Sequence, residues 1–577
     1  MTEEIVGIDL GTTNSEIAVY RDGRPAVLGD EQGRLILPSV VGLSESGELL
    51  VGEAARNQFL LYPERTIRSI KRRMGSEERV RLGEREYTPQ EVSAIILSRL
   101  KEIAEQRLDR PVRRAVITVP AYFSDAQRQA TRDAGEIAGL EVARIINEPT
   151  AAALAYEAGQ HQGKRILVYD LGGGTFDVSV VRIEEGVVEV ISSHGNNHLG
   201  GDDFDHKLVE HVLEHLKLKH DVDVSDQPRA MARIQRSAEE AKKRLSDHAF
   251  TRITEEYIAE RSGTPVHLDL ELSRSDYEDM ITPFIEETLG AVHIALEAAG
   301  LASSQVDEIL LVGGATRTPL VRRRLAEVFA MDPRGEVDPD LCVAMGAAIQ
   351  GAAMTGTDVS AVLVDVTPYT FGTSALGDLD GELYPYTFVP IVAKNTPIPV
   401  RRSEVFFTVS DQQQTVELRI FQGENRDALE NIQIGEFQVT GLSKAPAGNP
   451  VIVELALDRD GILQVAAREK ITGLERRITI NNAISRYDDA QLEAARQKVG
   501  ALFGEQTTSR ESAAPSDAEL ESLLAKARAK LDEAGEEDRT EIIDLIEAIH
   551  VARSNGDTAA LETARGQLQD LLFYLET

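Results

Sequence analysis

Several residue types are scarce in this chain of 577 residues, and each scarcity excludes a class of protein. There is one cysteine, Cys342, and no tryptophan. A single thiol cannot form a disulfide framework or a cysteine-based zinc site within the chain, which fits a reducing compartment. No run approaches the roughly 18 uninterrupted apolar residues of a membrane helix. The opening "MTEEIVGIDL" lacks the basic region of a secretory signal. We therefore expect a cytoplasmic protein without membrane contact.

Basic residues are also in short supply. The chain has 62 Lys and Arg against 96 Asp and Glu, a formal net charge of −34. Phosphate backbones are bound through clustered Lys and Arg, so no nucleic-acid partner is expected. The hydrophobic share of 42% is ordinary for globular protein. The length predicts about three or four domains.

The hydrophobic pattern divides the chain into successive parts. Residues 1–355 alternate short β-branched runs with amphipathic stretches, which predicts an α/β domain. Residues 356–365 are predicted to be an interdomain linker. Residues 366–485 are rich in short alternating runs with turn signals, which predicts a β-sheet domain. Residues 486–577 are predicted to be helical.

Two similar glycine-rich turns stand out in the first part. "GIDLGTTNSEI" (7–17) and "YDLGGGTFDVS" (169–179) each join two short strands through Asp-Leu-Gly and threonine. Glycines let backbone N–H groups approach an anion closely. Carboxylates beside a phosphate require a cation between them, and Mg²⁺ is the natural one. One copy alone is equally typical of a tight turn, whereas two copies favour a nucleotide polyphosphate gripped from both sides.

A third glycine pair occurs in "LLVGGATRTP" (310–319). Gly313 and Gly314 follow an apolar strand and would let a base or ribose lie against the backbone, while Arg317 could stack on it. Alone, such a pair is more typical of a strand-to-helix turn. It supports a nucleotide site because it is the third glycine-rich turn in one domain.

The ordered motifs resemble those of one family. "GIDLGTTNS", "VPAYFSDAQRQATRDAG", "IINEPTAAALAY", "DLGGGTFDVS", "HLGGDDFD" and "LVGGATRTP" are similar to the motif set of the DnaK-type, seventy-kilodalton heat-shock chaperones, closest to the short HscC branch. The likeness continues through "DVTPYTFG", "AKNTPIP", "QGEN" and "DGIL". It implies a duplicated, two-lobed actin-like α/β ATPase domain (1–355), a linker (356–365), a β-sandwich peptide-binding domain (366–485) and a short α-helical lid (486–577).

The resemblance also implies roles for particular residues of the ATPase domain. Lys71 would contact the γ-phosphate and the attacking water, and Asp9 and Asp170 would hold Mg²⁺ through water, with K⁺ as a further candidate ion. Glu148 and Thr175 complete the implied catalytic set. The implied ATP/ADP-binding residues are Gly11, Thr12, Thr13, Asn14, Gly172, Gly173, Gly174, Thr175, Gly201, Glu239, Lys242, Lys243, Ser246, Gly313, Gly314, Ala315, Arg317 and Asp340.

Further positions are implied outside the nucleotide site. The peptide channel would be lined by Phe406, Val409, Val416, Leu418 and Ile452, although period-2 patterning equally allows ordinary sandwich core. Interdomain coupling would use Pro120, Arg128, Val362, Leu363 and Val364. The implied function is ATP-driven capture and release of unfolded or partly folded protein segments, with a J-domain co-chaperone. The need for an exchange factor is left open.

Two other functions use the same nucleotide-binding fold. A small-molecule kinase would need a sugar or glycerol pocket, and an actin-like filament protein would need neither appended part. Residues 365–577 argue against both. The stretch "HVLEH" (211–215) matches a zinc-peptidase pattern. Its histidines flank an apolar helix face and no third ligand follows, which favours a solvent-facing helix.

The chain departs from the family pattern at several places. The stretch between Lys71 and "YTPQEV" is short, which puts exchange-factor contacts there in question, and Ser360 replaces an acidic linker residue. "SALGDLDGELYPYTF" (374–388) is expected to be an extended loop at the channel mouth. Ala447 stands where many members carry an arginine that latches the lid. With "GEQTTSRESAAPS" as a flexible break, we expect the lid to hold peptide weakly.

Overall fold

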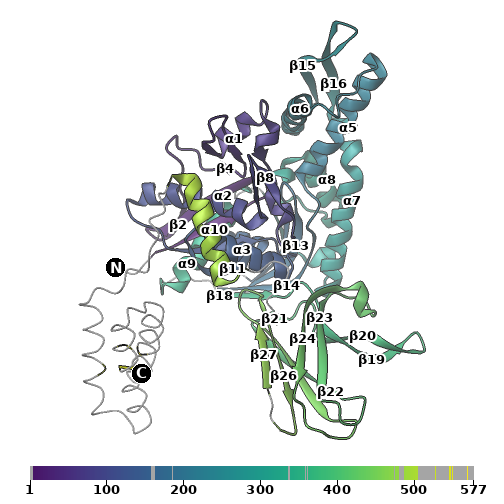
Figure 1. The fold of residues 1–577 in the computed structure, drawn as a ribbon. Helices are drawn as coiled ribbons and strands as arrows, with labels where there is room; N and C mark the ends of the chain where they lie inside the picture. Colours follow the sequence, from purple (N-terminus) through teal and green to yellow (C-terminus); the bar gives the residue numbers. More distant parts are fainter. Residues whose placement is uncertain are drawn as a thin grey trace. The chain divides into compact units, whose positions relative to one another are not determined.

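The structure is a computed structural model that describes most of the chain. The described residues are 4–157, 163–184, 186–334, 338–357, 359, 362–472, 475–479 and 487–504, with isolated positions 527, 545, 546, 549 and 568. The contacts separate two compact units, Met1–Val499 and Gly500–Thr577. The first unit is described below (Figure 1). The predicted break at "GEQTTSRESAAPS" and most of the predicted lid lie outside the described residues.

The first lobe is built on a mixed sheet in the order β11-β10-β1-β2-β3, with β4 paired to β2. Helix α2 begins where the sequence signals it, because Thr88 and Glu91 form a capping box around Pro89. Its elements are β1 Ile5–Leu10, β2 Asn14–Arg21, β3 Arg24–Val27, β4 Leu37–Pro38, β10 Arg114–Val119, β11 Glu141–Asn147, α2 Pro89–Leu108 and α3 Asp125–Ile137.

Short elements complete this lobe. They form a three-stranded sheet, β6-β5-β7, and a two-stranded one, β8-β9. Their bounds are β5 Val41–Leu43, β6 Leu49–Val51, β7 Thr66–Ile67, β8 Val80–Leu82, β9 Arg85–Tyr87, α1 Glu53–Gln58, η1 Pro63–Arg65 and η2 Ile70–Arg73.

The second lobe repeats the plan with a sheet in the order β17-β12-β13-β14-β18-β21. As in the first lobe, an antiparallel pair (β12 and β13) carries the glycine turn, and a parallel strand (β17) flanks it. Its elements are β12 Lys164–Leu171, β13 Phe176–Glu184, β14 Val187–Asn196, β15 Phe250–Arg261, β16 Thr264–Ser273, β17 Glu308–Val312, β18 Val362–Val366, β21 Pro397–Ile398, α5 Gly201–His220, α6 Pro228–Asp247, α7 Arg274–Ala298, η3 Ser303–Gln305, η4 Gly314–Arg317 and α8 Pro319–Phe329.

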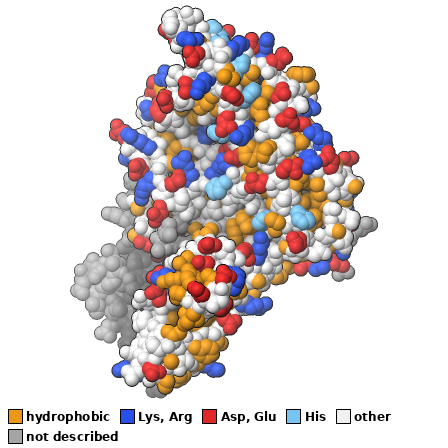
Figure 2. Space-filling model, turned by 90° about the vertical axis from the view of Figure 1, so that its right-hand side faces the viewer, with side chains coloured by type: hydrophobic (Ala, Val, Ile, Leu, Met, Phe, Trp, Pro, Cys, Tyr) orange, Lys and Arg blue, Asp and Glu red, His pale blue; other side chains and the backbone are white. Residues whose placement is uncertain are grey.

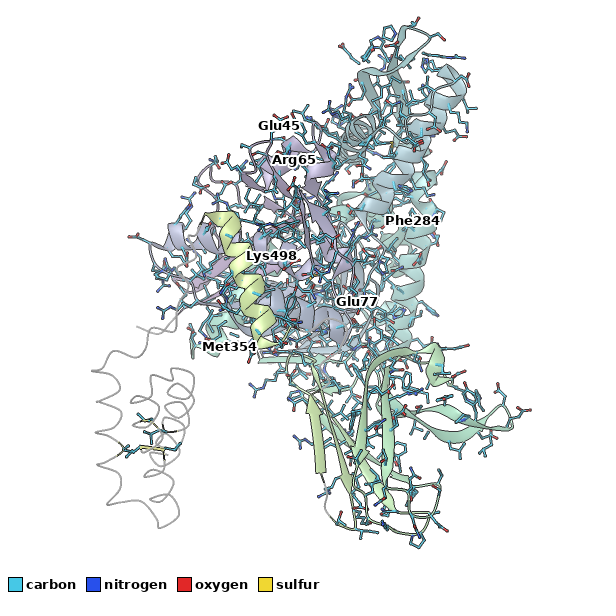
Figure 3. The ribbon with its side chains drawn as sticks, viewed as in Figure 1. Glu45, Arg65, Glu77, Phe284, Met354 and Lys498 are labelled. Atoms are coloured by element: carbon cyan, nitrogen blue, oxygen red, sulfur yellow. The ribbon has the colours of Figure 1, made fainter. Side chains whose placement is uncertain are left out.

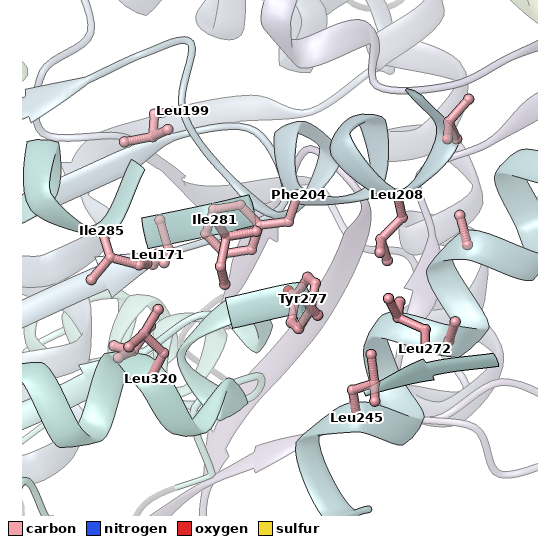
Figure 4. Packing of buried hydrophobic residues seen from close by; sticks show 14 of the residues in the cluster. Leu171, Leu199, Phe204, Leu208, Leu245, Leu272, Tyr277, Ile281, Ile285 and Leu320 are labelled. Carbon is pink, nitrogen blue, oxygen red and sulfur yellow. The ribbon is translucent and has the colours of Figure 1, made fainter. Parts of the chain in front are cut away.

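Two apolar cores hold the lobes in shape. The larger one packs the helices of the second lobe on their sheet, with Phe204, Tyr277 and Ile281 among its buried residues (Figure 4). The other joins the lobes, because α4 (Glu148–Glu157) and α9 (Cys342–Met354) pack with strands of both sheets. The two glycine turns are therefore held on a common framework.

A β-sandwich follows. One sheet runs β20-β19-β23-β24 and the other β22-β25-β26-β27. Within the strand-rich part expected from the sequence, β23 shows the alternation directly, with Leu418 and Ile420 buried and Glu417 exposed. The bounds are β19 Phe371–Leu379, β20 Glu382–Val392, β22 Val400–Phe407, β23 Thr415–Gln422, η5 Ala428–Glu430, β24 Ile432–Thr440, β25 Pro450–Leu457, β26 Leu463–Glu469 and β27 Glu475–Thr479.

The segment 374–388 is not the extended loop expected from the sequence. It belongs to the hairpin of β19 and β20, which turns at Asp380 and Gly381, both with positive φ (54° and 90°). Asp-Gly is a strong hairpin signal. Leu376 and Leu383 are 50% and 75% exposed on this hairpin. Figure 2 views the molecule from the side toward which the hairpin points in Figure 1 and shows hydrophobic side chains gathered on its lower part.

The last described helix is α10 (Asp489–Gly500), followed by η6 (Ala501–Phe503). Lys498, labelled in Figure 3, donates to Glu91 Oε2 at 2.7 Å and lies 4.3 Å from the centre of the Tyr87 ring. Tyr487 and Thr88 hydrogen bond through their hydroxyls at 2.7 Å. The start of the predicted lid therefore contacts the first lobe at α2.

Candidate nucleotide site

The first glycine turn connects β1 to β2. Asp9 lies at the end of β1, where Thr118 Oγ1 donates to its Oδ1 at 2.9 Å. Ser39 braces the turn, donating from Oγ to the Gly11 carbonyl and from N to the Thr13 carbonyl, both at 2.8 Å. The turn is thus held from outside while its threonines face the opposite lobe.

The second turn connects β12 to β13 and meets the first at close range. A Cβ on Gly173 would lie 1.9 Å from Thr13 Oγ1. Only glycine allows this approach. The start of α5 supports the turn from behind, because Gly201 N donates to the Gly172 carbonyl at 2.9 Å and Asp202 N donates to the Gly173 carbonyl at 2.7 Å.

A cavity that opens to solvent lies between the turns. Most of the phosphate-side residues proposed from the sequence line it, and four lining residues were missed: Glu16, Val312, Pro339 and Val343. The proposed residues that line it are Asp9, Gly11, Thr12, Thr13, Asn14, Lys71, Glu148, Asp170, Gly172, Gly173, Thr175, Gly313, Gly314 and Asp340.

One buried ion pair crosses the floor of this cavity. Lys71 in η2 pairs with Glu148 at the start of α4, 77 residues away. The Lys71 side chain is 4% exposed and that of Glu148 is 9% exposed. Among the described residues that line the cavity, Lys71 is the only Lys or Arg. Five carboxylates line the same cavity, those of Asp9, Glu16, Glu148, Asp170 and Asp340.

The carboxylates are electrostatically crowded. Burial and the nearby charge of Glu148 raise the pKa of Asp9 to about 7. The same two causes raise the pKa of Asp170 well above its usual range. Burial also raises the pKa of Asp177, behind this site, to about 7, although the N–H groups of Ala121 and Tyr122 donate to its carboxylate. Such a group of acids needs a cation to be fully ionised.

The donors present fit a nucleotide with Mg²⁺. Thr13 Oγ1 is buried in the cavity wall without a hydrogen-bond partner, and the glycine turns leave room for phosphate oxygens. Asp9 and Asp170 offer the oxygen ligands that Mg²⁺ prefers. Among the described residues, no group of three or more His, Cys, Asp or Glu is placed to hold a metal ion unaided. A cation would therefore share its ligands with phosphate and water.

The residues proposed for the adenosine side are more dispersed. Gly313 has φ +81°, and a Cβ there would lie 2.4 Å from the Leu171 carbonyl oxygen. Ala315 and Arg317 both lie in η4, and Arg317 pairs with Asp340 at 2.6 Å. On α6, Lys243 pairs with Glu239 at 2.5 Å and Lys242 with Asp205 at 2.7 Å. Glu239, Lys242, Lys243 and Ser246 all lie on α6, and none of them lines the cavity described above.

The interdomain residues form a connected network. Arg128 on α3, beyond the buried Pro120, donates to Asn147 Oδ1 at 2.6 Å and to the Ala121 carbonyl at 3.0 Å. Asn147 in turn donates to Asp365 Oδ2, in β18, at 2.8 Å. From the sandwich side, the Asp460 carboxylate pairs with Arg132. Sequence reasoning missed Asp365 and Asp460.

The linker itself is a strand of the second sheet. Val362, Leu363 and Val364 of β18 pair in parallel with residues 187–189 of β14. Asp365 then pairs with Ile398 of β21. Leu363 packs against the core shared by the lobes.

The positions proposed for the peptide channel differ in exposure. Val409 is 69% exposed, whereas Leu418 is 4% exposed in the sandwich core. Phe406, Val416 and Ile452 are half-buried. The burial of Leu418 therefore agrees with the alternative that it is an ordinary core residue. The channel role of all five residues stays a prediction.

Ala447, the position at which many family members carry a latch arginine, donates from its backbone N to Asp411 Oδ1 at 2.9 Å.

The helix with "HVLEH" is α5. Leu208, Val212 and Leu216 are buried on it, and His211 and His215 are half-buried. Among the described residues, no helix is long and apolar enough to span a membrane.

The two lobes place their glycine turns on either side of one carboxylate-lined cavity, and a β-sandwich follows them in the chain. This arrangement defines a nucleotide-binding protein with an appended β-sheet domain. A family described as "Hsp70 protein" matches residues 5–80 and 77–575. The chain belongs to the Hsp70 family. The proteins named "Chaperone protein DnaK" from Thermotoga neapolitana and Thermotoga maritima are each 49% identical over 488 residues, covering 83% of this chain and 80% of the relative.

Family membership fixes the activity. Hsp70 chaperones are ATPases, so this chain is an ATP-dependent molecular chaperone. The small-molecule kinase alternative is not supported, because the family match continues through the β-sandwich. The relationship to the HscC branch stays a prediction.

Proposed function

We propose that ATP binding between the lobes is coupled to peptide release through the linker strand β18. The observation that carries this proposal is sheet continuity. Strands β12 and β13 hold the second glycine turn, β14 follows β13, and β18 and then β21 extend the same sheet toward the sandwich. A change in the turn can therefore shift a strand that leads directly into the peptide-binding domain.

Within the nucleotide site, we assign separate tasks to separate groups. The backbone N–H groups of the glycine turns and the hydroxyls of Thr12, Thr13 and Thr175 bind the phosphates. Mg²⁺, when bound, neutralises phosphate charge. Asp9 and Asp170 would hold the cation through water. Lys71 stabilises charge on the γ-phosphate oxygens, and Glu148, held by Lys71, orients the attacking water.

On the peptide side, β22 supports binding of extended chains. It pairs only with β25 among the described residues, so one edge is unpaired. Val405 and Phe407 are 42% and 62% exposed on this strand. A peptide that adds to such an edge is held by backbone hydrogen bonds and by apolar side chains. We propose unfolded or partly folded protein segments as ligands, a J-domain protein as the co-chaperone and a cytoplasmic setting.

The test is Leu363→Asp in the full chain. A carboxylate buried in the docked linker should disfavour docking by at least about tenfold. ATP should then no longer accelerate release of a labelled peptide, while Mg·ADP affinity stays unchanged because Leu363 is outside the cavity. Leu218→Asp, 79% exposed on α5, is the matched control. Stopped-flow release that ATP still accelerates normally in Leu363→Asp would contradict the coupling.

A further inference from the structure

One buried carboxylate in the cavity has no task in the scheme above. Glu16 lies on β2 opposite Asp9 of β1 in the antiparallel register. It is 2% exposed and lines the same cavity as Lys71 and the glycine turns. Its side chain is therefore part of the cavity wall, although it lies on β2, beyond the turn itself.

The Glu16 carboxylate also lacks a partner. No described residue donates a hydrogen bond to it or forms an ion pair with it. The neighbouring acids differ, since Glu148 is paired with Lys71 and Asp9 accepts a hydrogen bond from Thr118. A buried carboxylate without a partner is costly, so its presence in a cavity wall indicates a ligand that satisfies it.

The surroundings limit what that ligand can be. The charges nearest to Glu16 include those of Asp9, Asp340 and Glu148, which are negative, with Lys71 as the opposing cation. A phosphate entering this cavity would be repelled by Glu16 unless a cation lay between them. Mg²⁺ retains several waters and bridges carboxylates to phosphates, which suits an acid at the edge of the phosphate turn.

We propose that Glu16 is an additional carboxylate ligand, through water, of the divalent cation that enters with the nucleotide. Glu16 thereby makes nucleotide binding depend more strongly on that cation than Asp9 and Asp170 alone would. This inference rests on the proposed nucleotide site.

The test compares ADP affinity with and without Mg²⁺. Isothermal titration of the full chain gives the dissociation constant in EDTA and in saturating Mg²⁺, for wild type, Glu16→Gln and Glu16→Asp. In saturating Mg²⁺, Glu16→Gln should bind ADP about tenfold or more weakly, because the cation loses a carboxylate that holds its waters. The ratio of the two constants should fall by the same factor, and half-saturation of ADP-bound protein by Mg²⁺ should require more metal. Glu16→Asp, which keeps the charge, should retain most of the ratio.

The outcomes separate the possibilities. An equal ratio in wild type and Glu16→Gln overturns the role of Glu16 and leaves the site itself intact. A wild type that binds ADP without any dependence on Mg²⁺ overturns both this inference and the proposed site. Replacing an unpaired buried carboxyl group by an amide should not lower the melting temperature of the nucleotide-free protein. A large drop in both variants would show that Glu16 acts in folding and would also overturn the proposal.

Discussion

Replacing Lys71 by alanine is the most informative single change in the nucleotide site. The substitution removes the cation that balances Glu148 and leaves the five carboxylates that line the cavity without a lysine among them. A fully dry pair would lose about 3–5 kcal/mol when one partner is removed. Because the Lys71–Glu148 pair borders an open cavity, water can reach the remaining acid, and we expect a loss of about 1–2 kcal/mol in the nucleotide-free protein.

Catalysis should suffer far more than binding. Loss of a preorganised charge at the transition state should lower single-turnover hydrolysis by roughly 10²-fold or more. Mg·ATP affinity should change little, because the glycine turns are intact. Quenched single-turnover experiments with labelled ATP give the rate, and thermal unfolding gives the stability. Adding Glu148→Gln should recover the stability without recovering the rate. Hydrolysis at the wild-type rate in Lys71→Ala would exclude Lys71 from the reaction.

Two further predictions concern the β-sandwich. Val416→Phe should block binding of a short aliphatic peptide with little loss of stability. Val439, its cross-strand partner, is fully buried, so the control Val439→Phe should cost about 1–3 kcal/mol through overpacking. Unchanged peptide anisotropy together with a lowered melting temperature in Val416→Phe would assign Val416 to the core. Burial raises the pKa of Glu469, but hydrogen bonds from Ser443, Thr472 and Asn449 outweigh it and lower the pKa to about 2. Its contribution to stability, on the order of 3 kcal/mol, is therefore present above about pH 4.5 and lost as the pH falls toward 2. Glu469→Gln should make the melting temperature of the full chain depend less on pH over this range. An equally steep pH dependence in Glu469→Gln would contradict the assignment to Glu469.

Local sequence was sufficient for the elements whose conformation depends on near neighbours. The two Asp-Leu-Gly turns are observed between antiparallel strands as expected, because glycine spacing decides which backbone angles are accessible. Helix α2, Pro89–Leu108, is one of the amphipathic stretches expected in residues 1–355, and its capping box and Pro89 lie within one turn of its start. Segment 374–388, expected to be a loop, contains an Asp-Gly pair, which is a local signal for the hairpin that is observed.

Tertiary structure decided which of these local features meet. Lys71 and Glu148 are 77 residues apart, and no local pattern links them. Glu16 follows the first turn closely, yet only the register of β1 with β2 places it opposite Asp9 in the cavity wall. The linker reads as a short apolar run, and its pairing with β14 depends on an open strand edge contributed by residues about 175 positions earlier. Sequence by itself determined the turns, caps and alternating strands, because these depend on interactions over a few residues. The ion pair, the position of Glu16 and the continuous sheet depend on long-range packing, which brings distant segments together only when the whole core forms.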